Sequence, residues 1–263
     1  MLQPNGTLAY GRRGRAAANP ASCRPTSGRR DPIAAMPAQN GDLRRYYQRL
    51  LEAFGPQGWW PAETRLEVIL GAILTQNTTW RNAALAIARL RHAGMIDLTR
   101  LSAVPLGRLQ SLIKPAGFFR QKARTIQGFV LWLNQAHRGS LDQMFSRPAE
   151  GLRADLLRLK GLGPETVDAI LLYAGGKPFF VADAYTRRIL ARHGILTHDT
   201  GYHEAQQAIQ HGLDRDAGVY NEFHALLVEV GKQYCRREEA CCGSCPLEAF
   251  LPAGGPGPGT TAV

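Results

Sequence analysis

The stretch of sequence that decides the fold is LLRLKGLGPET, residues 156–166. Its first half has helical apolar spacing, and the glycines Gly161 and Gly163 permit positive φ and leave backbone N–H groups uncovered. Pro164 suits the first position of a second helix, because its φ is pre-set and it has no N–H to leave unpaired. Exposed amides at a helix N-terminus can hold a phosphate. The pattern predicts two helices joined by a tight turn, which is either a glycine-capped corner or a phosphate-binding hairpin.

An aspartate closes the apolar run that follows this hairpin. Asp183 lies in FFVADAY, residues 179–185, where the apolar run meets an expected helix start. As an N-cap it would accept hydrogen bonds from the amides ahead of it. A carboxylate at the rim of an apolar patch is also placed to stabilise positive charge developing on a deoxyribose, or to activate water. Because the two roles are compatible, Asp183 is the first candidate catalytic residue.

Helical periodicity extends outward from the hairpin through most of the chain. Pro61 and Pro105 precede helical stretches, and no segment alternates convincingly as a strand. About ten short helices with brief connections predict an all-α, orthogonal fold of two lobes with a cleft between them. The clearest stretches are 43–54, 64–75, 80–92, 118–135, 150–159, 165–174, 184–193 and 219–233, and glycines stand where helices should end at Gly55, Gly94, Gly117, Gly161 and Gly194.

Both ends of the chain differ in composition from this helical part. Residues 1–40 are rich in Gly, Ala, Pro, Asn and Arg without apolar periodicity, and residues 253–263 are rich in Gly and Pro, so both are predicted to be disordered tails. The first tail is basic. It is either a misassigned start, with Met36 as the true first residue, or a nonspecific DNA-binding tail, and it also resembles an organelle transit peptide. We expect a cytoplasmic, bacterial nucleoid-associated protein, with organelle targeting left open.

The charge of the chain favours a polyanionic partner. The formal net charge is +11, but six arginines precede the first acidic residue, Asp31. Without these six, 26 basic residues face 21 acidic ones, which leaves about +5 for the folded part. No apolar run approaches the length that spans a bilayer, and no long apolar heptad is present. We therefore expect a soluble monomer that binds nucleic acid and no membrane.

Four motifs in a fixed order resemble the endonuclease III branch of the helix-hairpin-helix (HhH-GPD) DNA glycosylases. They are residues 73–80 (ILTQNTTW), residues 114–118 (KPAGF), the hairpin with Asp183, and a cysteine-rich loop, and the resemblance covers roughly residues 42–252. It implies two lobes in a glycosylase domain, residues 41–233, and a metal loop, residues 234–252. It also implies binding of double-stranded DNA that contains damaged bases or abasic sites, base flipping, an essential aspartate matching Asp183, and a glutamine matching Gln76 that helps fill the gap.

One departure from the family pattern decides the expected mechanism. Bifunctional members carry a lysine in the first turn after the hairpin, and its amine forms a Schiff base with the sugar. This chain has Glu165 there, which cannot form an imine, although an acidic residue also suits a first helical turn. The resemblance therefore implies a monofunctional, hydrolytic glycosylase without lyase chemistry at that position. Candidate DNA-binding residues are Gln76, Asn77, Lys160, Gly161, Gly163, Glu165, Arg236 and Arg237.

Three motifs look most like the 3-methyladenine glycosylase subgroup, whose substrates are cationic alkylated purines. They are the Gly-Pro-Glu-Thr-x-Asp form of the hairpin, the segment Trp59-Trp60-Pro61, and the Gln-Asn-Thr-x-Trp motif. Aromatic rings would recognise such a base by cation–π attraction, about 1–2 kcal/mol when desolvated. Trp59, Trp60 and Trp80 are candidates for the base pocket, with core packing as the alternative. Some members of the subgroup carry a modified lysine, so Lys232 is a second catalytic candidate; the alternative role is a cation at a helix C-terminus.

The cysteine-rich loop resembles an incomplete iron–sulfur site. Cys235, Cys242 and Cys245 reproduce C-x6-C-x2-C, the first three ligands of the family's [4Fe-4S] loop. The fourth ligand falls at position 251, which is Leu251. Either Cys241 substitutes for it, or the fourth iron takes a non-cysteine ligand, or the loop holds a labile cluster, zinc or no metal. Because the loop lies far along the chain from Asp183, any metal is expected to be structural or redox-sensing.

Two other functions stay open at the level of sequence. One is a bifunctional glycosylase and lyase on oxidised pyrimidines that recruits another amine, such as Lys232. The other is a DNA-damage-binding protein that has lost catalysis. Borohydride trapping would identify the first, and tight binding to abasic DNA without base release would identify the second.

Overall fold

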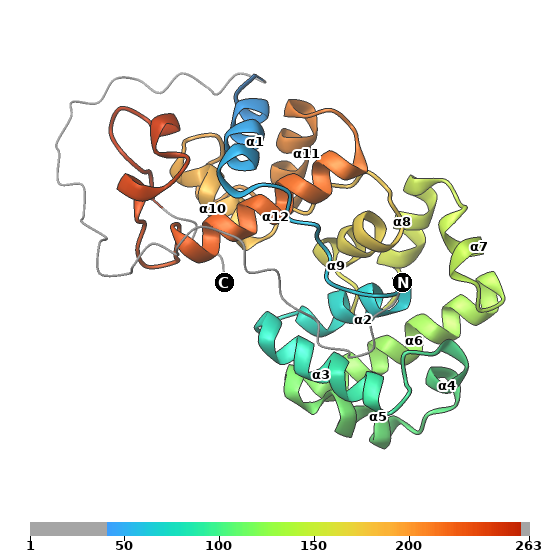
Figure 1. The fold of residues 1–263 in the computed structure, drawn as a ribbon. Helices are drawn as coiled ribbons and strands as arrows, with labels where there is room; N and C mark the ends of the chain where they lie inside the picture. The colour runs from blue at the N-terminus through green and yellow to red at the C-terminus, as the bar shows by residue number, and fades with distance from the viewer. Residues whose placement is uncertain (1–40, 259–263) are drawn as a thin grey trace, which may run out of the picture.

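The computed structural model describes residues 41–258 as an all-α protein (Figure 1). Residues 1–40 and 259–263, and with them Met36 and the expected N-terminal tail, lie outside the described residues. Within 41–258 no strand forms beyond an isolated antiparallel bridge between Cys235 and Ala240. The all-α prediction is confirmed. No helix in this part of the chain combines the length and the apolarity that crossing a bilayer requires.

The helices form two groups. In Figure 1, α2 to α7 lie on one side, α1 and α10 to α12 lie on the other with the cysteine loop, and α9 lies between them. The N-terminal α1 packs against α11 and α12, so both ends of the described chain belong to the second group. The bounds are α1 Gly41–Phe54, α2 Arg65–Thr75, α3 Trp80–His92, α4 Leu98–Ala103, α5 Leu106–Ile113, α6 Phe119–His137, α7 Leu141–Phe145, α8 Ala149–Leu157, α9 Pro164–Ala169, α10 Ala184–Arg192, α11 Tyr202–Gly212 and α12 Ala217–Gln233.

Short helical turns join or extend these helices. The 3-10 turn η2 (Lys114–Ala116) precedes α6, and the π-helical turn η3 (Ile170–Ala174) continues α9. Two further 3-10 turns, η4 (Cys242–Ser244) and η5 (Glu248–Phe250), lie in the cysteine loop. Every stretch with predicted helical periodicity contains a helix, and the five glycines expected at helix ends all have positive φ. The predicted ranges did not include α4, α5, α7 and α11, although Pro105 was expected to precede a helical stretch at the place where α5 begins.

Polar side chains start several of these helices where the sequence supplies a cap. The side chain of Thr64 accepts a hydrogen bond from the Glu67 amide at the start of α2, and Thr79 does the same for α3. Asp183 begins α10 in this way, as predicted. Each cap satisfies a backbone N–H that has no partner inside its helix.

A buried carboxylate fastens the hairpin to the second group of helices. Asp168 on α9 is fully buried, and it accepts hydrogen bonds from Arg153 Nε (2.6 Å) and Nη2 (3.0 Å) on α8. It also accepts from Tyr202 Oη (2.9 Å) and Gln206 Nε2 (2.7 Å) on α11. A buried charge is tolerated when its lone pairs are satisfied in this way. The network therefore fixes α9, and with it the residues of the hairpin.

Candidate functional site

A cavity of about 530 Å³ opens where the two groups of helices meet. Its walls come from the segment before α2, the α2–α3 loop, α9 with η3, the start of α10, and α12. Eight of the residues that the sequence singled out line it together: Trp59, Trp60, Gln76, Asn77, Trp80, Glu165, Asp183 and Lys232.

Asp183 presents a charged oxygen to this cavity. Its Oδ1 accepts a hydrogen bond from the Thr186 amide at 2.8 Å, and its Oδ2 lies 3.6 Å from His224 Nε2. Burial alone would raise the pKa of Asp183, but the charge of His224 beside it and the hydrogen bond from the Thr186 amide outweigh that effect. The net pKa lies below the ordinary value for an aspartate, so the group is ionised at neutral pH. Its side chain is 16% exposed, which leaves it accessible from the cavity.

Behind Asp183 stand two residues to which the sequence analysis gave no role. His224 on α12 contacts the Tyr173 hydroxyl through Nδ1, while its buried Nε2 faces Asp183 without a normal hydrogen-bond partner. Tyr173 belongs to the π-helical turn η3, and burial followed by the charge of Asp183 raises its pKa well above the ordinary value. Such π-helical turns occur often at functional sites. Tyr173 and His224 thus form a row behind Asp183, with His224 next to the carboxylate.

Glu165 lies at the mouth of the cavity, in the first turn of α9. Desolvation by the surrounding protein, followed by the charge of Asp183, raises its pKa to about 7, although His224 and Arg187 oppose the shift. The residue is exposed, so solvent relieves part of this desolvation. A second carboxyl that changes charge near neutral pH therefore stands beside the ionised Asp183.

Three tryptophans form an aromatic wall on one side of the cavity. The ring centroids of Trp60 and Trp80 lie 5.3 Å apart, and Trp59 lies 5.8 Å from Trp60 and 6.2 Å from Trp80. Tyr173 extends the wall, with its ring 5.0 Å from that of Trp60. Lys232 Nζ lies 5.3 Å from the Trp59 ring centroid. All three tryptophans are half-buried, so their ring faces are available to a planar ligand.

Of the predicted DNA-contact residues, Gln76, Asn77 and Glu165 line the cavity, whereas Lys160, Gly161 and Gly163 belong to the hairpin turn and Arg236 and Arg237 to the cysteine loop. Gln76 donates through Nε2 to Gly161 O (3.0 Å) and to Thr166 Oγ1 (2.8 Å), which ties the α2–α3 loop to the hairpin. Gly161 has φ +92°, a conformation that L side chains rarely adopt. Lys160, Gly163 and Asn77 are exposed next to these contacts.

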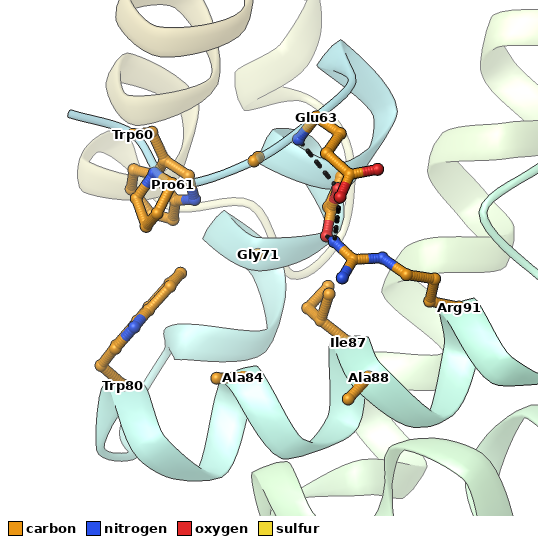
Figure 2. A pocket seen from close by; sticks show the side chains of 11 residues that line it. Trp60, Pro61, Glu63, Gly71, Trp80, Ala84, Ile87, Ala88 and Arg91 are labelled. Atoms are coloured by element: carbon orange, nitrogen blue, oxygen red, sulfur yellow. Dashed lines mark hydrogen bonds and ion pairs between the residues drawn. The ribbon is translucent and has the colours of Figure 1, made fainter. Parts of the chain in front are cut away.

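A second cavity, of about 470 Å³, shares Trp60 and Trp80 with the first (Figure 2). Ala84, Ile87 and Ala88 of α3 line its floor in Figure 2, and Arg91 stands at the end opposite the tryptophans. The guanidinium of Arg91 contacts the Glu67 carboxylate directly and lies 3.8 Å from that of Glu63. The buried carboxylate of this cavity, that of Glu67, is thus held in a direct ion pair.

The four cysteines of the loop, Cys235, Cys241, Cys242 and Cys245, line one small cavity together with Leu251 and Arg192. Cys235, Cys242 and Cys245 are free thiols, whereas Cys241 is disulfide-bonded, so the expected substitution of Cys241 for the ligand missing at Leu251 is not what the structure has. Arg192 Nη1 donates to Cys235 Sγ at 3.1 Å and to Arg236 O at 2.7 Å, while the side chains of Arg236 and Arg237 are exposed. Burial, followed by the neighbouring thiols, raises the pKa of Cys245 to about 12. Within residues 41–258 no three His, Cys, Asp or Glu side chains form a single-ion site. The sulfur donors suit an iron–sulfur cluster chemically, since clusters take thiolate ligands.

Comparison with known proteins places this geometry in a family. A family model described as "HhH-GPD superfamily base excision DNA repair protein" matches residues 70–215. A putative DNA repair glycosylase of Methanocaldococcus jannaschii is 39% identical over 210 residues, which cover 79% of this chain and 94% of that protein. Endonuclease III of Sulfolobus acidocaldarius is 26% identical, covering 69% of this chain and 79% of its own length.

Solved structures agree with this assignment. The structure of H. pylori 3-methyladenine DNA glycosylase bound to 1,N6-ethenoadenine superposes with a TM-score of 0.65 at 26% identity, covering 74% of this chain and 98% of that one. A trapped endonuclease III–DNA covalent intermediate gives a TM-score of 0.71 at 22% identity, covering 82% and 97%, which supports the fold. The chain therefore belongs to the HhH-GPD superfamily of base excision repair proteins, as an endonuclease III-like DNA glycosylase.

Proposed function

We propose that this protein is a monofunctional glycosylase that flips an alkylated purine out of double-stranded DNA into the tryptophan-walled cavity and releases it by hydrolysis. One observation carries the proposal. The ionised Asp183 faces the cavity, and the residue beside it, at the position where a lyase would need an amine, is Glu165. Among the described residues that line the cavity, Lys232 supplies the one amine, and it lies over the Trp59 ring.

The chemistry follows from the charge on Asp183. As the glycosidic bond breaks, positive charge develops on the deoxyribose, and a fixed carboxylate stabilises it without reorganisation. The same carboxylate can accept a proton from the attacking water, a role typically worth 10²–10⁴-fold in rate. His224 and the Thr186 amide keep the aspartate ionised and oriented. These residues therefore favour hydrolysis over imine formation.

The aromatic wall supports the choice of substrate. Trp59, Trp60 and Trp80 offer ring faces, and a cationic base gains about 1–2 kcal/mol from such faces when desolvated. Alkylated purines carry that charge and leave readily without protonation. The similar H. pylori protein is a 3-methyladenine DNA glycosylase. These observations together favour alkylated purines over oxidised pyrimidines.

Exposed side chains of the loops fit contacts with the duplex. Phe118, at the N-terminus of α6, is 65% exposed and has φ +43°, so an apolar ring is held out to solvent. Exposed apolar side chains of this kind can wedge between base pairs. Gln76 is the second residue proposed to fill the gap, and the hairpin amides with Lys160 would hold a phosphate. Arg236 and Arg237 are proposed as further phosphate contacts of a protein that acts as a monomer.

The proposal is tested by measuring base release from alkylated duplex DNA, with strand breaks scored before and after hot alkali. We expect the wild-type protein to release methylated purines and to leave breaks that appear only after alkali. The variant Asp183→Asn is expected to lose release while keeping affinity for abasic DNA. Breaks without alkali would contradict the monofunctional mechanism, and no release by the wild-type protein would favour a damage-binding protein.

Lys232 supports one second candidate, a bifunctional enzyme, because its amine is in the cavity. Borohydride trapping of a covalent enzyme–DNA adduct distinguishes the two. An adduct that disappears in Lys232→Gln would establish lyase chemistry through this residue. We expect no adduct, since Lys232 lies over Trp59 and within 3.9 Å of Glu229.

We also propose that the cysteine loop holds an iron–sulfur cluster through the free thiols of Cys235, Cys242 and Cys245, with a non-cysteine ligand in place of the cysteine missing at Leu251. Their common position around one cavity supports this assignment. Such a cluster would brace the loop that carries Arg236 and Arg237. Iron and sulfide analysis of anaerobically purified protein is expected to show a cluster that Cys242→Ser loses; zinc, or no metal at all, would contradict the proposal.

A further inference from the structure

Lys122, on α6, is a buried cation that the proposed chemistry does not use. It is 3% exposed, and its Nζ donates to the backbone carbonyls of Leu74 at 2.9 Å and Ala116 at 2.8 Å. Desolvation lowers its pKa to about 8. Burying an ammonium group is costly unless its protons are hydrogen-bonded, so these two bonds are what make the position tolerable.

The two carbonyls that Lys122 binds lie at the base of two loops, of which the α2–α3 loop lines the cavity. Leu74 is in the last turn of α2, where carbonyls lack a partner inside the helix and carry the negative end of the helix dipole. Ala116 ends η2. Gln76 follows two residues after Leu74, and Phe118 follows two residues after Ala116. A single ammonium therefore joins the loops that carry both proposed gap-filling side chains.

The same stretch of α6 also supports the hairpin. A Cβ added to Gly161 would lie 2.1 Å from Thr125 Oγ1, so the turn packs directly on the helix one turn beyond Lys122. The hydrogen bond from Gln76 to Gly161 O also connects the α2–α3 loop to this turn. Three segments far apart in sequence thus take their relative positions from one face of α6.

We propose that Lys122 is a positioning residue for base flipping: it sets the spacing of the α2–α3 and α5–α6 loops so that Gln76 and Phe118 enter the duplex together. This inference rests on the proposed function. Its effect falls on extrusion of the base and not on cleavage of the glycosidic bond, because Lys122 reaches neither Asp183 nor the other residues that line the cavity.

A role in flipping separates experimentally from a role in stability or chemistry. Flipping a paired base costs a few kcal/mol of unpairing and unstacking, and the cost is least when the base has no partner. A loss of spacing should therefore slow release from a paired lesion more than from an unpaired one. A general loss of folded protein, or a catalytic defect, would lower both rates equally.

The test compares single-turnover release of 7-methylguanine paired with cytosine and 7-methylguanine opposite an abasic site, by wild-type protein and Lys122→Met. We expect the variant to be slowed about tenfold or more on the paired lesion and less than about threefold on the unpaired one. A 2-aminopurine next to the lesion should show the matching loss of unstacking. Lys177→Met is the control, since Lys177 Nζ also donates to a backbone carbonyl, that of Arg147, at 3.1 Å.

Each outcome bears on the proposal. Equal slowing of Lys122→Met on both substrates, or selective slowing of Lys177→Met, would overturn it. Rates are normalised to protein competent to bind abasic DNA; if Lys122→Met does not fold, Lys122→Gln, which keeps an N–H donor, is compared in the same way. Failure of the wild-type protein to release 7-methylguanine from either duplex would instead count against the proposed function.

Discussion

Two cavities share Trp60 and Trp80, and they differ in how their carboxylates are compensated. In the cavity of about 530 Å³, Asp183 faces His224 at 3.6 Å and keeps one oxygen available to a guest. In the cavity of about 470 Å³, Glu67 is in direct contact with Arg91. Since both have an aromatic wall, the wall alone does not make a reactive site. A largely buried carboxylate that is not in direct contact with a cation distinguishes the first cavity from the second.

The largest expected effect comes from removing that charge. Asp183→Asn should lower base release by about 10²–10⁴-fold, because the stabilising carboxylate is lost. Asparagine is as good an N-cap as aspartate, so α10 should keep its start. Single-turnover kinetics give the rate, and thermal unfolding of the same samples should show a nearly unchanged midpoint. Residual release within about tenfold of wild type would mean that Asp183 does not carry the chemistry.

Breaking the ion pair of the second cavity should instead affect stability. Arg91→Met leaves Glu67, which is 4% exposed, without its cation, so the free energy of unfolding should fall by about 2 kcal/mol. The rate of base release per folded molecule should stay at the wild-type value. Urea unfolding measures the first quantity, and Glu67→Gln in the Arg91→Met background should restore part of it. A lower rate with unchanged stability would assign this cavity a part in the reaction.

A change in the shared wall should give a smaller effect. A Cβ at Gly71 would lie 3.2 Å from the Trp60 ring, so the indole must shift by a few tenths of an ångström. We expect Gly71→Ala to slow release of alkylated purines about threefold to tenfold while the helix gains up to about 1 kcal/mol from alanine. Slower release from an equally or more stable protein would show that the position of Trp60 matters. An unchanged rate would show that the wall adapts.

The smallest expected effect concerns pH and the carboxyl at the mouth. Glu165, with a pKa raised to about 7, is neutral below that pH and negative above it. Raising the pH from about 6 to about 8 should therefore weaken binding to abasic duplex DNA about threefold, through repulsion of phosphates across a solvated gap. Glu165→Gln should remove this dependence. Fluorescence anisotropy at one fixed salt concentration measures it, and the same slope in both proteins would exclude Glu165 as its source.

Sequence reasoning worked where structure depends on neighbouring residues. The hairpin and the start of α10 at Asp183 follow from local turn and capping chemistry. Four helices lay outside the predicted ranges: α4 and α7 span less than two turns, α5 was marked only by Pro105, and α11 gave no clear signal.

Contacts between distant segments could not be predicted in the same way. Tyr173 and His224 meet across 51 residues, and Lys122 binds the Leu74 carbonyl across 48. A lysine in a helix with charged neighbours has no sequence signal for burial, because that burial depends on which loops fold over it. The cysteine spacing predicted a common location but not the orientation of the thiols, which the packing of Arg192 against Cys235 determines.

Asp183 begins α10 with one oxygen and faces the cavity with the other. In a mutational library sorted for soluble expression, most substitutions at this position would be lost with the start of the helix, before any assay of repair. Serine, threonine and asparagine would survive, because they still cap. Expression data alone would therefore suggest that position 183 has a purely structural role and accepts any polar residue that caps the helix. A second sort for alkylation resistance of the host cell should remove those survivors and expose the chemical requirement.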